Sequence, residues 1–90
     1  MPDWSLPDFE WDDDNIGHLL ERHGVYPEEA EQIFYNNGHI RRGKDVYYAM
    51  GTTEHGRYLF VVFVYRRGRV RVVSARTMTR EERRIYERHR

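Results

Sequence analysis

The sequence predicts a small α+β fold built on an antiparallel sheet, and three observations indicate it. Residues 58–65 form a continuous run rich in β-branched and aromatic residues, typical of a strand that is buried on both faces in the middle of a sheet. Residues 69–76 mostly alternate between polar and apolar side chains. They follow a tight turn at 66–69 in which Gly68 supplies a positive φ. Helical patterns precede and follow this hairpin, so helices and sheet are segregated along the chain.

The N-terminal part of the chain predicts a tail, a short strand and a helix. Residues 1–7 contain two prolines and predict a loose tail, and residues 9–11 alternate like an edge strand. Asp12 is placed to cap a helix whose first turn carries further acids. Gly24 is expected to end this helix in the left-handed conformation. The apolar stripe of the helix comprises Ile16, Leu19, Leu20 and His23.

The remaining elements follow from caps and turns. Pro27 opens a second helix that runs to about Tyr35 and buries Ala30, Ile33 and Phe34, before the stop signal of residues 36–38. Residues 39–42 and 46–53 predict a hairpin that turns near residues 43–45. Residues 79–82 form a capping box that opens a terminal helix. We therefore expect one domain over residues 1–90 with the order β-α-α-β-β-β-β-α.

Composition limits the classes of function. The 90 residues contain no cysteine, which excludes disulfides and cysteine-based zinc sites, and no segment has the roughly 18 apolar residues that span a bilayer. The N-terminus lacks the basic and apolar regions of a signal peptide. We expect a cytoplasmic protein without a membrane partner.

The charges are distributed unevenly although the net charge is zero. Residues 1–38 hold ten acidic residues and one basic residue, whereas residues 39–90 hold fourteen basic and five acidic residues. One interpretation is a surface that binds a polyanion such as nucleic acid. The other is that acidic helices cover a basic sheet and the charges neutralise one another.

No metal or cofactor is expected. The histidines do not follow a ligand pattern, because His18 and His23 are five residues apart and point in different directions from a helix. No glycine-rich phosphate loop is present, and nothing in the sequence supports Ser74 as a nucleophile.

The cluster of Arg, Tyr, Glu and His residues around the sheet suits metal-independent RNA cleavage. Arginines bind phosphate oxygens in pairs of hydrogen bonds and stabilise the charge that develops on phosphorus. Glu, His or Tyr side chains can transfer the protons, and tyrosines can stack on unpaired bases. Tyr47, Tyr48, Tyr58 and Tyr65 equally suit packing within the sheet.

Arg57 and Arg76 are the strongest candidates for phosphate binding. They begin and end adjacent antiparallel strands, so we expect them at the same end of the sheet, close enough to hold one phosphate. Counting by twos from Arg76 places Ser74, Val72 and Val70 on its face, and Arg69 and Arg71 on the other. The alternative for both candidates is a structural salt bridge to the acidic helices. His23 equally suits a helix C-terminal cap.

The terminal helix has few apolar residues, Ile85 and Tyr86 among them. Its packing on the domain is therefore expected to be slight, or to be completed by a partner.

The order of several short motifs resembles the BrnT toxin family. These motifs are Phe-Glu-Trp-Asp at 9–12, Arg-His-Gly-Val at 22–25 before Glu-Glu-Ala at 28–30, and Ser-Ala-Arg at 74–76 before Thr79 to Arg83 and Tyr86. The resemblance implies a RelE-like ribonuclease toxin of a bacterial type II toxin–antitoxin module that cleaves mRNA and blocks translation. It also implies neutralisation by a BrnA-like ribbon-helix-helix antitoxin, through which operator DNA is bound. The short loop at 43–45 departs from the family pattern and leaves substrate preference open.

By this resemblance His23 and Arg76 occupy family motif positions, and Arg57 matches an arginine at the start of the central strand. We expect the catalytic residues to be Arg57, Arg76, His23, Tyr86 and Glu54, with the proton-transfer role open among His23, Glu54, His55 and Tyr86. We expect RNA-binding residues at Arg41, Arg42, Lys44, Arg66, Arg67 and Arg80. Two alternatives stand beside this one: a catalytically weak member that mainly binds an antitoxin, and a small fold whose arginines are structural.

Overall fold

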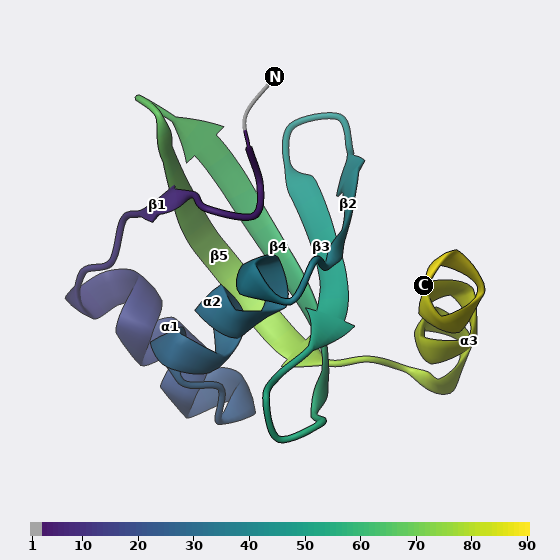
Figure 1. The fold of residues 1–90 in the computed structure, drawn as a ribbon. Helices are drawn as coiled ribbons and strands as arrows, with labels where there is room; N and C mark the ends of the chain where they lie inside the picture. Colours follow the sequence, from purple (N-terminus) through teal and green to yellow (C-terminus); the bar gives the residue numbers. More distant parts are fainter. Residues whose placement is uncertain (1–2) are drawn as a thin grey trace.

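A computed structural model describes residues 3–90 and confirms the α+β class. The elements are β1 (Asp8–Phe9), α1 (Asp13–His23), α2 (Pro27–Tyr35), β2 (His39–Arg42), β3 (Tyr47–Thr52), β4 (Tyr58–Arg66), β5 (Arg69–Thr77) and α3 (Arg80–His89). They form a five-stranded sheet of order β1-β5-β4-β3-β2, in which only β1 pairs in parallel (Figure 1). The predicted element order and the central position of β4 are confirmed.

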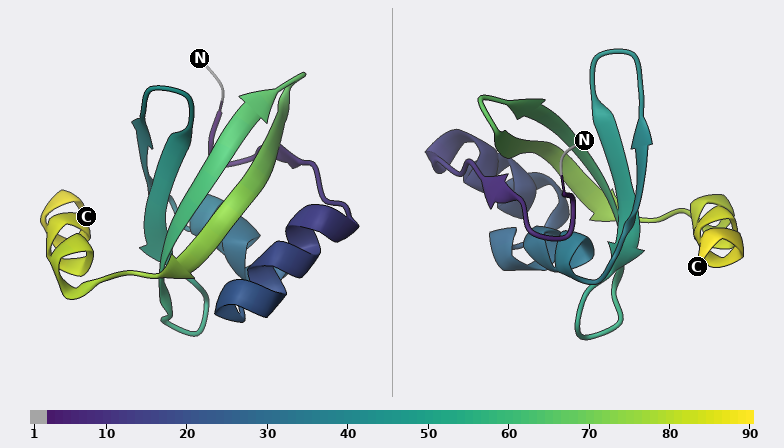
Figure 2. Two further views of the ribbon diagram at one scale, coloured as in Figure 1. Left: turned by 180° about the vertical axis from the view of Figure 1, so that it is seen from behind. Right: turned by 45° about the horizontal axis from the view of Figure 1, so that its top comes forward.

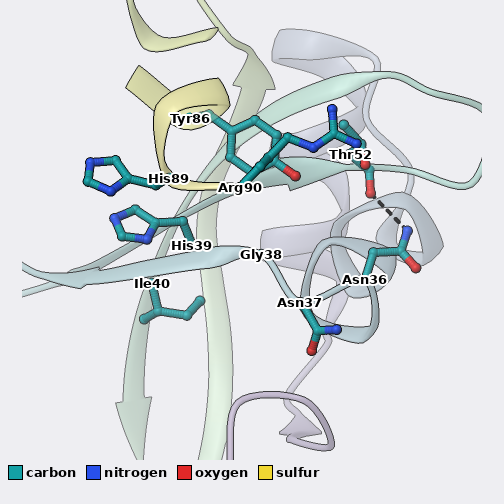
Figure 3. A pocket seen from close by; sticks show the side chains of 9 residues that line it. All are labelled: Asn36, Asn37, Gly38, His39, Ile40, Thr52, Tyr86, His89 and Arg90. Carbon is teal, nitrogen blue, oxygen red and sulfur yellow. Dashed lines mark hydrogen bonds between the residues drawn. The ribbon is translucent and has the colours of Figure 1, made fainter. Parts of the chain in front are cut away.

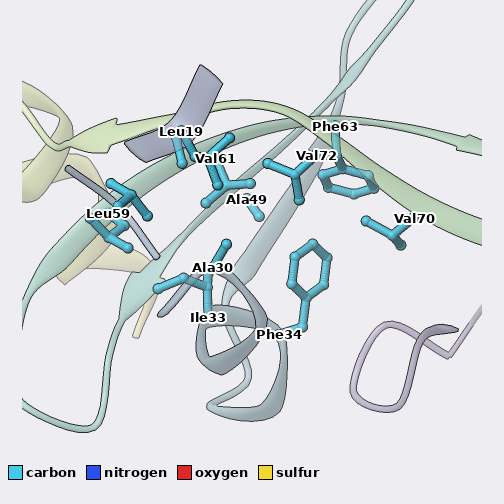
Figure 4. Close-up of a cluster of buried hydrophobic side chains, with 12 residues drawn as sticks. Leu19, Ala30, Ile33, Phe34, Ala49, Leu59, Val61, Phe63, Val70 and Val72 are labelled. Atoms are coloured by element: carbon cyan, nitrogen blue, oxygen red, sulfur yellow. The ribbon is translucent and has the colours of Figure 1, made fainter. Parts of the chain in front are cut away.

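The main core lies between one face of the sheet and helices α1 and α2. Alternate residues of β4, namely Leu59, Val61 and Phe63, are fully buried on this face. Ala30, Ile33 and Phe34 of α2 are buried against them, as predicted (Figure 4). Gly24 has φ 61 at the end of α1 and returns the chain toward α2, also as predicted. This first face is therefore closed to ligands.

The opposite face of the sheet is largely open, which corrects the expectation that residues 58–65 are buried on both sides. Tyr58, Phe60, Val62 and Val64 are only partly buried. Seen from behind, β4 and β5 face the viewer and α3 stands to one side of them (Figure 2, left). A smaller cluster of Met50, Met78 and Tyr86 attaches α3 to this face. The slight packing predicted for the terminal helix is confirmed.

A β-bulge in β5 changes which side chains share a face. The register pairs Val62 with Ser74 but Phe63 with Val72, so Val73 is an extra residue in β5. Val70 and Val72 therefore lie in the core, whereas Arg76 lies opposite Phe60 and Arg71 opposite Val64 on the open face. The prediction that Arg76 shares a face with Val70 and Val72, and that Arg71 lies on the other face, was wrong because counting by twos ignores the bulge.

The β4–β5 turn uses two positive φ angles. Arg67 has φ 54 and Gly68 has φ 74, the pattern of a two-residue type I′ hairpin loop. The sequence indicated only the glycine, because arginine rarely adopts this conformation.

The N-terminal segment is more ordered than predicted. Trp4 packs on Tyr47, Phe63 and Tyr65, with ring centroids 5.1–5.3 Å apart, so residues 3–7 are not a loose tail. The first two residues of that predicted tail lie outside the described chain. The short strand is Asp8–Phe9 rather than residues 9–11, and the indole Nε1 of Trp11 instead donates to Glu31 Oε2 at 2.7 Å. Within residues 3–90, no helix has the length and apolar character needed to cross a membrane.

Candidate functional site

The open face of the sheet carries a row of polar and aromatic side chains beside α3. Neighbouring strands place Arg41, Tyr48, Val62 and Ser74 in one row, and His39, Met50, Phe60 and Arg76 in the next. A pocket of about 320 Å³ opens between these rows and α3. Arg41, Tyr48 and Glu82 contribute polar groups to its wall, and Met50, Phe60 and Ile85 contribute apolar surface.

Arg76 is held beside this pocket by Glu82, by the ring of Phe60 and by the carbonyl of Thr77, to which its Nη1 donates at 3.3 Å. Its guanidinium donates Nη1 to Glu82 Oε1 at 2.7 Å and Nη2 to Glu82 Oε2 at 2.8 Å. The same group lies 4.6 Å from the centre of the Phe60 ring, a cation–π distance. The Nη1 and Nη2 groups of Arg76 thus donate side by side, the arrangement that binds a carboxylate or a phosphate.

The ion pair also sets the protonation state of Glu82. The hydrogen bonds from Arg76 hold the pKa of the Glu82 carboxyl below its usual value, against the opposing effect of burial, and the amide of Thr79 adds to the shift. The pKa of Arg76 is raised, chiefly by its hydrogen bonds with Glu82. Glu82 is therefore a carboxylate at neutral pH.

Glu82 also belongs to the capping box of α3. Thr79 N donates to Glu82 Oε1 at 2.9 Å, and Glu82 N donates to Thr79 Oγ1 at 3.1 Å. The predicted capping box is confirmed, but the sequence did not indicate that the capping carboxylate would also bind Arg76. No local pattern carries that signal, because the contact depends on how the chain turns between β5 and α3.

Arg41 and Arg42 give the pocket a positive rim. Both are exposed on β2, and within residues 3–90 neither forms an ion pair. The Arg42 guanidinium lies 5.8 Å from the Tyr47 ring. Lys44 is exposed in the adjoining β2–β3 loop. These three predicted RNA-binding residues therefore gather near one another.

Arg57 lies on the opposite side of the sheet from Arg76. Its Nη1 donates to Gly24 O and to Glu29 Oε1, both at 3.1 Å, and its Nη2 donates to His23 O at 3.3 Å. The expectation that Arg57 and Arg76 hold one phosphate is therefore wrong. Arg57 precedes β4 at an odd-numbered position, which shares the side of Leu59 and Val61 that faces the helices, whereas Arg76 pairs with Phe60 on the other face.

The other predicted catalytic residues are dispersed. The His23 side chain is exposed at the end of α1. Glu54 lies in the β3–β4 turn, where its backbone amide donates to Gln32 Oε1. His55 is exposed in the same turn. Tyr86 is buried, with its ring 6.0 Å from that of Tyr58. None of them lines the pocket beside Arg76.

The remaining predicted RNA-binding residues lie apart from this pocket. Arg66 and Arg67 are at the β4–β5 turn, the end of β5 remote from Arg76, and Arg66 Nε is 3.4 Å from Glu10 Oε1. Arg80 is exposed in the first turn of α3.

A second pocket, of about 390 Å³, lies between the C-terminal turn of α3 and the start of β2 (Figure 3). There the rings of His39 and His89 stack with centroids 4.6 Å apart and planes 5° from parallel. Burial, followed by the charges of His89 and Arg41, lowers the pKa of His39. The sequence could not indicate this pair, because one histidine begins β2 and the other ends α3, far apart in the chain. No group of three or more His, Asp or Glu residues able to hold a metal occurs within residues 3–90.

The second interpretation of the uneven charge, mutual neutralisation, is confirmed for part of the basic residues. Acids from the N-terminal part neutralise Arg57, Arg66 and Arg71, the last through Asp12 Oδ2 at 2.7 Å. Arg41 of β2 forms no ion pair within residues 3–90, so its positive charge persists on the open face.

The fold and this arginine-edged face define a class of protein: a small α+β domain of RelE-like form, with an exposed sheet face suited to a polyanion. A comparison with protein families finds a match over residues 11–82 to the family described as ribonuclease toxin, BrnT, of type II toxin-antitoxin system. The chain belongs to this BrnT family. The match begins at Trp11 and extends through Arg76 to Glu82. No curated protein matches the chain.

Proposed function

We propose that this chain is a cytoplasmic endoribonuclease toxin that cleaves mRNA without a metal ion and thereby inhibits translation. Membership of a ribonuclease toxin family supports the reaction class. The observation that carries the assignment to a site is Arg76, held by Phe60 and Glu82 next to a pocket edged by Arg41 and Arg42.

In this proposal each group has a chemical role. Arg76 binds the non-bridging oxygens of the scissile phosphate and stabilises the charge that grows on them, a role that a metal fills elsewhere. Arg41 and Arg42 bind neighbouring phosphates, since RNA backbone contacts are largely electrostatic. Tyr48, partly buried on β3, offers a ring for base stacking beside the same pocket.

The proposed partner is a BrnA-like ribbon-helix-helix antitoxin, and operator DNA is contacted only through the complex with it. Membership of a type II toxin–antitoxin family supports a protein antitoxin. The largely uncovered face of β4 and β5 is the surface on which a protein partner would block the pocket from RNA.

The test compares wild type with Arg76→Ala. Induced wild-type protein is expected to arrest growth and degrade RNA, and purified protein to cleave single-stranded RNA in EDTA. Loss of one charge-stabilising group is expected to reduce cleavage by about 10²–10³-fold. Arg88→Ala is the matched control, because Arg88 is exposed on the far side of α3 and is expected to leave cleavage unchanged.

Folded, well-expressed wild type that neither arrests growth nor cleaves RNA would contradict the proposal. Such a result would favour the second candidate function, an antitoxin-binding module. The neutralisation of Arg76 by Glu82 in the resting protein is the observation that favours this alternative. Antitoxin binding measured on the same preparation would then establish it.

A further inference from the structure

Glu82 is positioned to do more than cap α3. Among the described residues it is the one carboxylate that lines the pocket beside Arg76, and its side chain is 20% exposed, so a ligand in the pocket can reach it. We infer that Glu82 is a catalytic residue. In the resting protein it forms an ion pair with Arg76; an RNA phosphate then displaces it from Arg76, and its carboxylate accepts the proton of the attacking 2′-hydroxyl. This inference rests on the proposed ribonuclease function.

The first step is an exchange of anions on Arg76. Both Glu82 oxygens accept from the two Nη atoms of Arg76, the bidentate arrangement that an Arg–phosphate pair reproduces. The stacking of Arg76 on Phe60 does not depend on Glu82, so the guanidinium can keep its position while its partner changes. A phosphate bound to Arg76 therefore lies within side-chain reach of the displaced carboxylate.

The second step is proton transfer. Once Arg76 binds phosphate, Glu82 loses the hydrogen bonds that most lower its pKa. A nearby phosphate adds negative charge, which raises the pKa further and makes the carboxylate a better base. The capping bond from Thr79 N remains and holds the side chain at the start of α3.

The reaction balances without a cofactor. The 2′-oxygen forms a bond to phosphorus while its proton passes to a Glu82 carboxylate oxygen. The bond between phosphorus and the 5′-oxygen breaks, and that oxygen takes a proton from water. The products are a 2′,3′-cyclic phosphate and a 5′-hydroxyl end, and Glu82 returns its proton to solvent.

The sharpest test is Glu82→Gln, which keeps the length of the side chain and an oxygen for the capping bond. With a short single-stranded RNA, the rate of cleavage at saturation is expected to fall by about 10²–10⁴-fold. Affinity for the same RNA carrying 2′-O-methyl groups, which block cleavage, is expected to stay equal or increase, because the carboxylate that competes with RNA for Arg76 is gone. Glu81→Gln, in the same turn but exposed on the outer side, is the matched control.

Each outcome has a distinct meaning. Glu82→Gln that cleaves within about threefold of wild type overturns the inference and leaves the ribonuclease proposal intact. Equal losses of cleavage and of binding also overturn it, since they indicate a structural role. Wild type that cleaves no RNA overturns the proposed function and the inference together.

A pH profile covers the case in which Glu82→Gln does not fold. Single-turnover cleavage by wild type is expected to decline on the acid side as a carboxylate takes up a proton, and a rate that stays flat down to pH ~4 would overturn the inference. His39, on the same face, also titrates in acid, so the profile is repeated with His39→Gln. The acid limb is expected to persist in that variant, and its disappearance would also overturn the inference.

Discussion

At the scale of single residues, the two central arginines have different surroundings and therefore different expected roles. Arg57 joins the start of β4 to the end of α1 through two main-chain carbonyls, and to α2 through Glu29. Arg76 instead borders an open pocket. Hydrogen bonds from a guanidinium to the carbonyls at a helix C-terminus stabilise the fold, so we expect Arg57 to have a structural role.

Arg57→Ala is therefore expected to lower the free energy of unfolding by roughly 1–2 kcal/mol, since hydrogen bonds to a charged group are involved but the side chain is about one third exposed. Urea unfolding measures this loss. Cleavage per folded molecule is expected to remain close to wild type. Arg84→Ala, on the outer side of α3, serves as the control for removing an arginine. A folded Arg57→Ala protein that no longer cleaves RNA would instead indicate that Arg57 belongs to the active site.

At the scale of elements, α2 approaches the sheet through two glycines. A Cβ at Gly51 would lie 2.8 Å from Ile33 Cγ2 and 3.2 Å from the Cα of Gly38. At Gly38 it would lie 2.7 Å from the Ile33 carbonyl oxygen. The end of α2, the start of β2 and the end of β3 can therefore pack only where side chains are absent.

Gly51→Ala is expected to lower the free energy of unfolding by about 1–3 kcal/mol, because the fully buried Ile33 side chain must shift to admit the methyl group. Gly17→Ala is the matched comparison: Gly17 lies inside α1, its Cβ would meet nothing within 4 Å, and the change is expected to stabilise by about 0.5–1 kcal/mol. Chemical denaturation of both variants checks the pair. Equal effects in the two would show that packing at Gly51 is not the cause.

The attachment of α3 is also expected to depend on pH. The stacked His39 and His89 rings hold the end of α3 beside β2. The pKa of His39 lies below its ordinary value of 6.5 in the folded protein, because of burial and the nearby charges of His89 and Arg41. The unfolded chain thus takes up this proton first, so stability falls as the pH drops below about 6.5 and levels off below the folded pKa.

Urea unfolding at pH 7.5 and 5.5 measures this loss, and His39→Gln is expected to reduce it. His55→Gln is the control, because His55 is exposed in the β3–β4 turn. A pH dependence unchanged by His39→Gln would assign it to other groups.

At the scale of the whole molecule, the acidic N-terminal part and the basic remainder fold against each other. Ion pairs from Glu10, Asp12 and Glu29 neutralise arginines at the edge of the sheet and at its helix-covered end. The positive charge that remains beside the pocket is that of Arg41 and Arg42 on β2. A chain of zero net charge thereby retains local positive charge at the pocket.

Much of the fold was predictable from local patterns. Caps, turns and alternation located the helices and long strands, because each depends on contacts among residues close in sequence. Asn15 was missed: it is buried at the start of α1 and donates to Glu10 O and Val72 O. A single polar residue in a helix does not reveal a bond to a strand 57 residues away.

The sequence by itself determined the α+β class, the order of elements and the uneven charge, and its motifs indicated the family. Tertiary structure alone decided which residues make up the candidate site. The bulge at Val73 turned Arg76 onto the open face, and the turn after β5 brought Glu82 to it, while Arg57 was directed to the helices. The reason is physical: side-chain direction in a sheet reverses with one inserted residue, and ion pairs between separate elements depend on distances that local patterns do not specify.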